Sequence, residues 1–175
     1  VDMGWGRTGG IGPWREGHAG FPDMPGLARK LRRKGVRPGI WIRPLRSAEA
    51  QPPGVYFPAG RFDDRRYSGA VLDPSRADVL DHITADVRRL RDWGYELIKH
   101  DYSTRDLLGR WGFEMGAQLT PDGWSFSDRS RTTAEIITGL YRAIRHGARD
   151  AVVIGCNTIG HLAAGTVELQ RTGDD

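Results

Sequence analysis

Apolar residues recur at two different spacings along this chain of 175 residues. In three stretches they recur every three or four residues, the pattern of a helix with one buried face. Between these stretches lie short, continuous apolar runs rich in β-branched residues, which are typical of buried strands. The helical spacing predicts helices at 25–34, 76–93 and 132–146. The short runs predict strands at 38–43, 95–101, 151–155 and 166–171, and the first two residues resemble the end of a further strand.

Residues at the ends of the predicted helices support these boundaries. Gly35 suits the position just after the end of the first helix, where a left-handed backbone is common. Ser75 is expected to be the N-cap of the second helix. Thr132 and Glu135 have the spacing of a capping box at the start of the third, and Gly147 is expected to end it.

Strands that alternate with helices predict βαβ units and a parallel sheet, so the predicted fold class is α/β. A (β/α)8 barrel and an open doubly wound sheet both fit this order, and both place ligands at the carboxyl ends of the strands. No GxGxxG or GxxxxGK[ST] motif follows a strand, which disfavours nucleotide binding. About ten residues separate the strands at 151–155 and 166–171, so a full crossover helix barely fits there.

Charge and composition disfavour several other classes of protein. The net charge of +4 is modest, and the densest basic run, 28–35, is expected to be a solvated helix face. The chain has no nucleic-acid-binding motif and no apolar run of the roughly 18 residues that a membrane span needs. The single cysteine, Cys156, excludes an intrachain disulfide framework. The chain opens inside a strand-like run, so we expect it to be part of a longer protein, and leave localisation and oligomeric state open.

Polar side chains gather where the predicted strands end: Asp2; Trp41 and Arg43; Lys99 and Asp101; Cys156 and Asn157; and Arg171, Asp174 and Asp175. Lys99 and Asp101 are two positions apart, so both side chains are expected on one side of their strand. A buried lysine is costly without a partner. The pair is therefore either a local structural ion pair or an acid kept ionised by an ammonium group, as a nucleophile requires. The two terminal acids are either a solvated tail or part of a site.

Two carboxylates on different strands of one rim are what glycoside cleavage requires. One attacks or stabilises the anomeric carbon, and the other protonates the leaving oxygen. Six tryptophans, several of them in predicted loops, would add flat surfaces for sugar rings, although each one taken alone is more ordinarily a core residue. The residues therefore favour a glycosidase that acts on an oligosaccharide or glycoside.

The same residues stand in motifs that resemble the catalytic barrel of retaining α-galactosidases, the melibiase group of glycoside hydrolase families 36 and 27. The stretches that carry the resemblance occur in order and span nearly the whole chain: VDMGW, GFPDMPGLARKLRRKGVRPGIWIRPL, LDPSRADVLDHI, DWGYELIKHDYS, IGCN and RTGDD. The resemblance implies a TIM (β/α)8 barrel, of which residues 1–175 would form one partial catalytic domain with about the second to sixth strands. It also implies that no metal or other cofactor takes part.

Catalytic roles follow from the resemblance, position by position. The acid that closes the Lys-x-Asp strand corresponds to the family's nucleophile, which is Asp101 here. The Arg-x-x-x-Asp stretch corresponds to a sugar-binding arginine and the general acid/base, which are Arg171 and Asp175. Asp174 falls at a spacer position between them. The resemblance thus implies a double displacement through a covalent glycosyl-enzyme.

Substrate-binding roles are implied in the same way. Lys99 corresponds to a lysine that touches sugar hydroxyls, and Asp2 lies in the stretch that binds the axial O4 and the O6 of galactose. Trp41 falls where the family has an aromatic residue beside the sugar. Cys156 and Asn157 fall where the family reads the substituent at C2.

One departure from the family pattern concerns the specificity for galactose. Many members have two adjacent acids in the first motif, whereas Met3 holds the second position here. N-acetylgalactosamine and β-L-arabinopyranose therefore stay open as alternative sugars. Two other functions also stay open, a non-catalytic sugar-binding barrel and a related barrel α-glucosidase. His100 is expected to point away from the site, opposite to its two neighbours.

Overall fold

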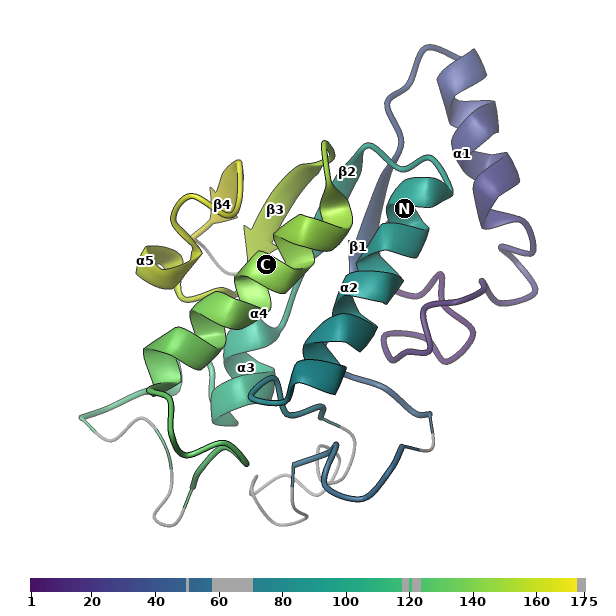
Figure 1. The fold of residues 1–175 in the computed structure, drawn as a ribbon. Helices are drawn as coiled ribbons and strands as arrows, with labels where there is room; N and C mark the ends of the chain where they lie inside the picture. Colours follow the sequence, from purple (N-terminus) through teal and green to yellow (C-terminus); the bar gives the residue numbers. More distant parts are fainter. Residues whose placement is uncertain (50, 58–70, 118–119, 121–123, 173–175) are drawn as a thin grey trace.

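The structure is a computed structural model that describes residues 1–49, 51–57, 71–117, 120 and 124–172. The elements in chain order are α1 (Met24–Arg33), β1 (Gly39–Ile42), α2 (Ala77–Asp92), β2 (Leu97–His100), α3 (Ser103–Leu108), the 3-10 turn η2 (Gly112–Glu114), α4 (Thr133–Ala148), β3 (Val152–Cys156), α5 (Gly160–Ala163) and β4 (Leu169–Arg171) (Figure 1). All four predicted strands and all three predicted helices are present.

The four strands form one parallel sheet in the order β1-β2-β3-β4, which confirms the predicted α/β class. Trp41 pairs with Lys99, and Cys156 pairs with Arg171, so the predicted rim residues follow one another across neighbouring strands. Val1 continues the sheet beyond β1. Its amino group donates to the Gly39 carbonyl at 2.7 Å, and its carbonyl accepts from the Trp41 N–H at 3.0 Å.

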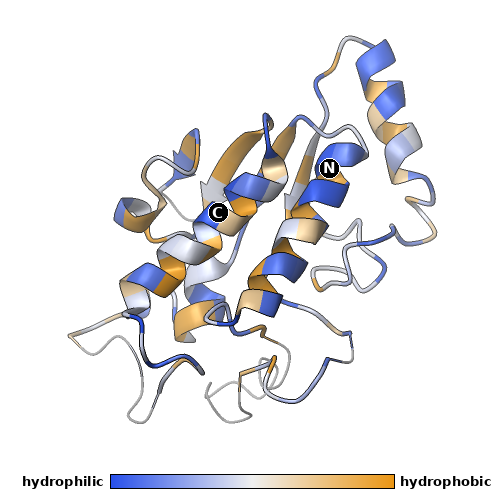
Figure 2. Cartoon of the chain, viewed as in Figure 1, coloured by the Kyte–Doolittle hydropathy of each residue, from blue (hydrophilic) through white to orange (hydrophobic). Residues whose placement is uncertain are grey.

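Two long helices, α2 and α4, lie side by side over one face of the sheet (Figure 1). Their apolar stripes and the strand residues that face them form the core, and Figure 2 shows apolar strands behind helices of mixed character. The sequence had suggested that Gly147 ends this helix, but Gly147 lies within α4. A Cβ atom there would lie 2.6 Å from the Thr84 carbonyl oxygen, so the glycine allows the close approach of the two helices.

The two faces of the sheet differ in burial. Along β2 and β3 the residues alternate between half-buried and buried. Ile98, His100 and Val153 are buried on the face that α2 and α4 cover, whereas Lys99 and Ile154 on the other face are half-buried. In a complete barrel, each strand is buried on both faces. A parallel sheet with one buried and one half-buried face resembles part of such a barrel wall.

Some helix boundaries differ from the sequence prediction. The helix α2 begins at Ala77, and its N-cap is Arg76, whose side chain makes no capping bond. Ser75 lies one position before this N-cap, and its hydroxyl accepts the Asp128 N–H at 3.1 Å. The capping box of Thr132 and Glu135 is confirmed at the start of α4.

Two short helices were not predicted, and both lie in segments that the sequence analysis left as loops. The helix α3 follows β2 almost directly, and its residues lack a long apolar stripe. The four-residue helix α5 lies between β3 and β4, where the short connection leaves room for one turn.

Candidate active site

Asp101 follows β2 directly and is the most buried of the predicted site acids that the structure describes, with 3% of its surface exposed. Its backbone N–H still donates to the Ile42 carbonyl at 3.0 Å, so the sheet fixes the backbone up to this residue. Its carboxylate accepts from the Trp41 indole N–H at 3.0 Å, the Asn157 amide at 2.8 Å and the Tyr102 backbone N–H at 2.7 Å.

These donors decide the charge of Asp101. Burial by itself would raise the pKa of this carboxyl group, because an ion is poorly solvated inside a protein. The hydrogen bonds from Asn157, Trp41 and the Tyr102 N–H outweigh that effect and lower the pKa below its usual value. Asp101 is therefore ionised at neutral pH.

Lys99 does not play the part that the sequence suggested. We expected it to pair with Asp101 or to keep that acid ionised. Among the described residues its ion pair is instead with Asp2, whose carboxylate lies 3.9 Å from the Lys99 ammonium group. The side chain of Asp2 is 75% exposed, so this contact is a weak, solvent-screened one. Hydrogen bonds, and not the ammonium, hold Asp101 ionised.

Trp41 is almost fully buried and packs edge-on against Trp14, with ring centroids 5.7 Å apart. Its ring therefore packs mainly in the core, and its indole N–H reaches the carboxylate of Asp101. The sequence predicted Trp41 beside the sugar, and the structure shows its indole N–H bonded to the carboxylate of Asp101.

Cys156, Asn157 and Arg171 lie together on the other side of Asp101. The Arg171 guanidinium donates to the Cys156 sulfur at 3.5 Å, and Asn157 reaches both that sulfur and Asp101. Burial raises the pKa of the Cys156 thiol, and the charge of Asp101 adds to this effect. Asn157 adopts a left-handed backbone with φ 52°, which turns its amide towards the acid. The thiol is therefore a neutral part of the wall.

Two predicted residues, Asp174 and Asp175, lie outside the described residues. The separation of the carboxyl groups of Asp101 and Asp175 therefore stays a prediction. The prediction that His100 points away from the site agrees with its burial against Tyr141 of α4, with ring centroids 5.7 Å apart.

The sequence analysis missed Tyr102 and Asp106. Tyr102 has a left-handed backbone with φ 67°, which is strained for a residue with a side chain and costs on the order of 1–3 kcal/mol. Asp106 lies buried on α3 and accepts both a 2.8 Å bond from Nε and a second bond from Nη2 of Arg43. A buried acid in a segment without apolar periodicity gives no sequence signal, although its partner Arg43 at a strand end was visible in the sequence.

Two hollows border these residues. One of about 360 Å³ is lined by Asp2, Met3, Trp41, Lys99, Asp101 and Tyr102. The other, of about 370 Å³, includes Trp111, Met115, Asn157 and Arg171 in its lining. The hydrogen bond between Asp101 and Asn157 joins the two linings. Six of the eight predicted site residues thus lie around one carboxylate and its hollows, and Cys156 contacts two of them.

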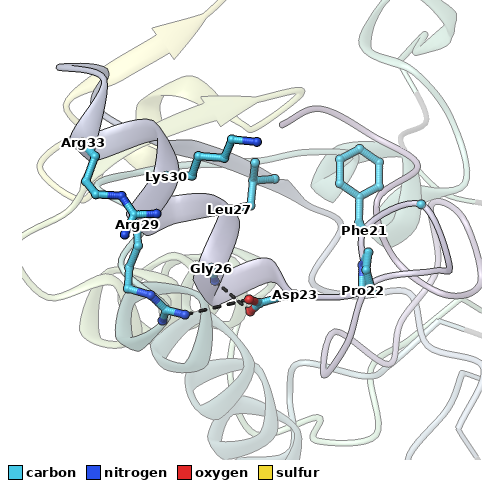
Figure 3. A pocket seen from close by; sticks show the side chains of 9 residues that line it. Phe21, Pro22, Asp23, Gly26, Leu27, Arg29, Lys30 and Arg33 are labelled. Atoms are coloured by element: carbon cyan, nitrogen blue, oxygen red, sulfur yellow. Dashed lines mark hydrogen bonds and ion pairs between the residues drawn. The ribbon is translucent and has the colours of Figure 1, made fainter.

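A separate hollow of about 510 Å³ lies beside α1 and shares no lining residue with the other two (Figure 3). Figure 3 shows Arg29, Lys30 and Arg33 projecting from α1, with Asp23 bonded to the Gly26 N–H and paired with Arg29 at 3.8 Å. Asp23, the N-cap of α1, is the only acid among the described residues that line this hollow, and the Gly26 N–H and Arg29 already engage its carboxylate. The volume of the hollow alone therefore does not make it a catalytic site.

Two general properties complete the description of the site. Within the part of the chain that the structure describes, no three histidine, cysteine or acidic side chains group so as to hold a metal ion. Over the same residues, no helix has the length and apolar character to cross a membrane.

Comparison with solved structures gives two related folds. The chain superposes on α-galactosidase TtGalA from Thermus thermophilus in complex with stachyose, with a TM-score of 0.72, 22% identity, and coverage of 100% of this chain and 36% of that one. The complex of the same enzyme with p-nitrophenyl α-D-galactopyranoside gives a TM-score of 0.73 at 22% identity, covering 100% and 34%. Isomalto-dextranase from Arthrobacter globiformis T6 with panose gives 0.60 at 18% identity, covering 88% and 28%.

These likenesses show the fold and no more. The chain spans about a third of the length of the solved proteins it resembles. No protein-family model and no curated protein sequence matches it. The chain therefore has an α/β fold with a parallel four-stranded sheet that resembles part of an α-galactosidase barrel.

Proposed function

We propose that this chain is part of a glycoside hydrolase that removes terminal α-galactosyl or similar α-glycosyl residues by a retaining double displacement. The observation that carries the proposal is Asp101, an acid held ionised by three hydrogen bonds at the edge of a hollow. The likeness of the fold to an α-galactosidase supports it.

Asp101 suits a nucleophile for two reasons. Its lowered pKa keeps the carboxylate charged and ready to form a bond with the anomeric carbon. Its hydrogen bonds come from a strand residue, a left-handed turn and a β3 loop, so the carboxylate is fixed before the sugar arrives. Fixed geometry of this kind lowers the cost of reaching the transition state.

The surrounding residues suit a sugar with several hydroxyl groups. Lys99 and Asp2 line the hollow beside Asp101 and offer a donor and an acceptor to neighbouring hydroxyls. Arg171 and Asn157 line the second hollow and offer donors on the far side of the acid. We assign these residues to substrate binding, with Trp41 and Cys156 as walls behind them.

The second carboxyl group is assigned to Asp175 from the family resemblance. Arg171 and Thr172 line the second hollow, and the chain reaches Asp175 three residues later. In the proposed cycle Asp175 first protonates the leaving oxygen and then accepts a proton from water. Retention requires about 5–5.5 Å between the two carboxyl groups, and inversion about 6.5–9.5 Å.

Azide rescue tests these two roles in the full-length protein with an aryl α-galactoside as substrate. Asp101→Ala should abolish turnover, and azide should restore it with inversion, because azide replaces the missing nucleophile. Asp175→Ala should give azide products with retained configuration, because the covalent intermediate still forms on Asp101. Hydrolysis by Asp101→Ala at the wild-type rate would reject the assignment.

A second candidate function is hydrolysis of α-glucosides. Two observations favour this candidate. The fold resembles that of an isomalto-dextranase bound to panose, and Met3 stands in place of a second acid. Paired assays with aryl α-glucoside and aryl α-galactoside separate the two sugars. Measurable binding of either sugar without turnover would instead support the non-catalytic barrel.

A further inference from the structure

Arg43 ties three parts of the molecule together just after β1. Its guanidinium carbon lies 4.1 Å from the centre of the Tyr102 ring, within the range of a cation–π contact. The same group binds both carboxylate oxygens of Asp106 on α3. Its own backbone carbonyl accepts the Trp14 indole N–H at 3.2 Å, so the main chain at Arg43 is fixed as well.

The ring that Arg43 covers belongs to the residue that directly follows Asp101. The Tyr102 backbone N–H donates to the Asp101 carboxylate at 2.7 Å, and Tyr102 itself adopts a left-handed conformation, with φ 67° and ψ 5°. The Tyr102 carbonyl then accepts the Asp106 N–H at 2.8 Å, which begins α3. The direction of the Tyr102 N–H is set by the peptide plane between Asp101 and Tyr102, so a shift of Tyr102 that rotates this plane would move the N–H off the carboxylate.

Several contacts hold this turn in place. The Tyr102 ring packs edge-on against Trp41, with centroids 6.4 Å apart, and against Trp111, with centroids 5.2 Å apart. Arg43 is in contact with both ends of the turn, through the Tyr102 ring and through Asp106.

A purely stabilising role does not require these charges. Buried ion pairs can often be replaced by apolar residues of similar size without loss of stability, because burial of the charges is itself costly. Arg43 and Asp106 have 10% and 0% of their side chains exposed, so the pair bears that cost in full. What a planar, two-pronged arginine adds over an apolar pair is a fixed orientation of its partners.

We propose that Arg43, supported by Asp106, is a positioning residue that holds the Tyr102 turn and thereby aims the Tyr102 N–H at the nucleophilic carboxylate. Arg43 does not line the hollow beside Asp101, so it acts through Tyr102 and not on the substrate. The inference rests on the proposed function in one respect, the catalytic role of Asp101.

Other charged and titratable groups also bear on Asp101, and a test must separate them from Arg43. They are Asp2, Lys99, Cys156, Arg171, Asp106 and His100. None of them is altered by Arg43→Lys, which keeps the positive charge near Asp106 and removes the planar fork. A change in that variant therefore reports orientation more than net charge.

The experiment compares Arg43→Lys and Asp106→Asn with the wild type in the full-length protein. We expect kcat for an aryl α-galactoside to fall about 10- to 100-fold in each, with KM changed less than about 3-fold, because a small misplacement of a reacting group has costs of this size. The acidic limb of kcat/KM should move to higher pH, because loss of the Tyr102 N–H bond raises the pKa of Asp101.

A matched control is Arg91→Lys. Arg91 makes the same two-pronged contact, to Asp150, with both distances 2.8 Å, but it lies on α2 away from Asp101. We expect this control to leave kcat and the pH profile unchanged. Thermal unfolding of each variant shows whether it is folded, and failure of both Arg43→Lys and Asp106→Asn to fold would assign the pair to folding and reject the positioning role.

A second measurement does not depend on turnover. The carboxyl ¹³C signal of Asp101, assigned with Asp101→Asn, can be followed during a pH titration of the wild type and of Arg43→Lys. A higher midpoint in Arg43→Lys supports the inference, even if the wild type hydrolyses no glycoside and the proposed function fails. Unchanged kcat, pH profile and midpoint in a folded Arg43→Lys protein would overturn the inference and leave the proposed function standing.

Discussion

Asp101 at the end of β2 and Asp106 in the following helix α3 are both buried acids, five positions apart, and their pKa values move in opposite directions. At Asp101, hydrogen bonds from three neutral donors outweigh burial and lower the pKa. At Asp106, burial raises the pKa although Arg43 and Arg46 act the other way, and the charge of Asp101 adds to the rise. The neutral donors around Asp101 thus favour its ionised form more than the Arg43 guanidinium favours that of the more deeply buried Asp106.

The difference indicates a division of labour. Asp101 borders a hollow, whereas Asp106 is fully buried beside an arginine. In our proposal, the first acid reacts, and the second holds the segment that follows the first. The following predictions test this division in order of expected effect.

The largest effect is expected from Asp101→Asn, a change that keeps the shape of the side chain. Loss of a nucleophile lowers kcat by about 10⁴- to 10⁶-fold in well-studied hydrolases. Steady-state hydrolysis of an aryl α-galactoside by the full-length protein measures it. A loss smaller than about 10-fold would place the nucleophile elsewhere.

Asp106→Asn should lower stability as well as kcat. It leaves Arg43 without its charged partner in a buried place, and breaking a buried pair costs about 3–5 kcal/mol. Chemical denaturation should show this fall in the free energy of unfolding, with Asp101→Asn as the control, since Asp101 makes its contacts with neutral donors. If Asp101→Asn proved the more destabilising of the two, the division of labour would be reversed.

His100, the last residue of β2, directly precedes Asp101 and shows what burial does to a basic group. It is fully buried, and burial lowers its pKa to about 4, so the folded state favours the neutral ring. The stability that this preference contributes is present above the unfolded pKa of 6.5 and is lost as the pH falls towards about 4.

The shift of His100 corresponds to about 3 kcal/mol over that range. We expect His100→Phe to remove this part of the acid sensitivity, as measured by denaturation at several pH values between 7 and about 4. An unchanged slope of stability against pH in the variant would show that other groups govern it. Asp101 acts at lower pH, because its own contribution is lost only below its usual pKa.

The smallest effect is expected from Asn157→Ala. It removes one of the donors to Asp101 and leaves the Trp41, Tyr102 and Cys156 donors in place. A hydrogen bond to a charged group contributes about 1.5–3 kcal/mol, so the pKa of Asp101 should rise by roughly one to two units. The acidic limb of kcat/KM should move upward by the same amount. Arg171→Lys serves as a comparison, since the Arg171 guanidinium donates to the Cys156 sulfur.

The sequence predicted the strands well because each is a short apolar run that a polar residue closes. The same pattern predicted that the polar residues at the strand ends lie near one another, since the carboxyl ends of parallel strands share one edge. The partner of Lys99 could not be read from spacing. Lys99 and Asp101 do lie on one side of β2, but the distance across the rim to Asp2 depends on how the strands twist.

The contacts that support Asp101 also could not be predicted from the sequence. The left-handed turn at Tyr102 occurs in a residue type that rarely adopts it, so no local preference announces it. Asp106 is buried in a six-residue helix too short to show a periodic pattern. Both features result from tertiary contacts with Arg43 and the tryptophans, which no single stretch of the chain specifies.

The most direct test of the central claim is to trap the covalent intermediate. The full-length protein is incubated with a 2-deoxy-2-fluoro-galactosyl fluoride, digested and analysed by peptide mass spectrometry. The account predicts a glycosyl ester on Asp101 and a protein that loses activity as the ester accumulates. A label on another residue, or steady turnover of galactosides with no label on any carboxylate, would contradict it.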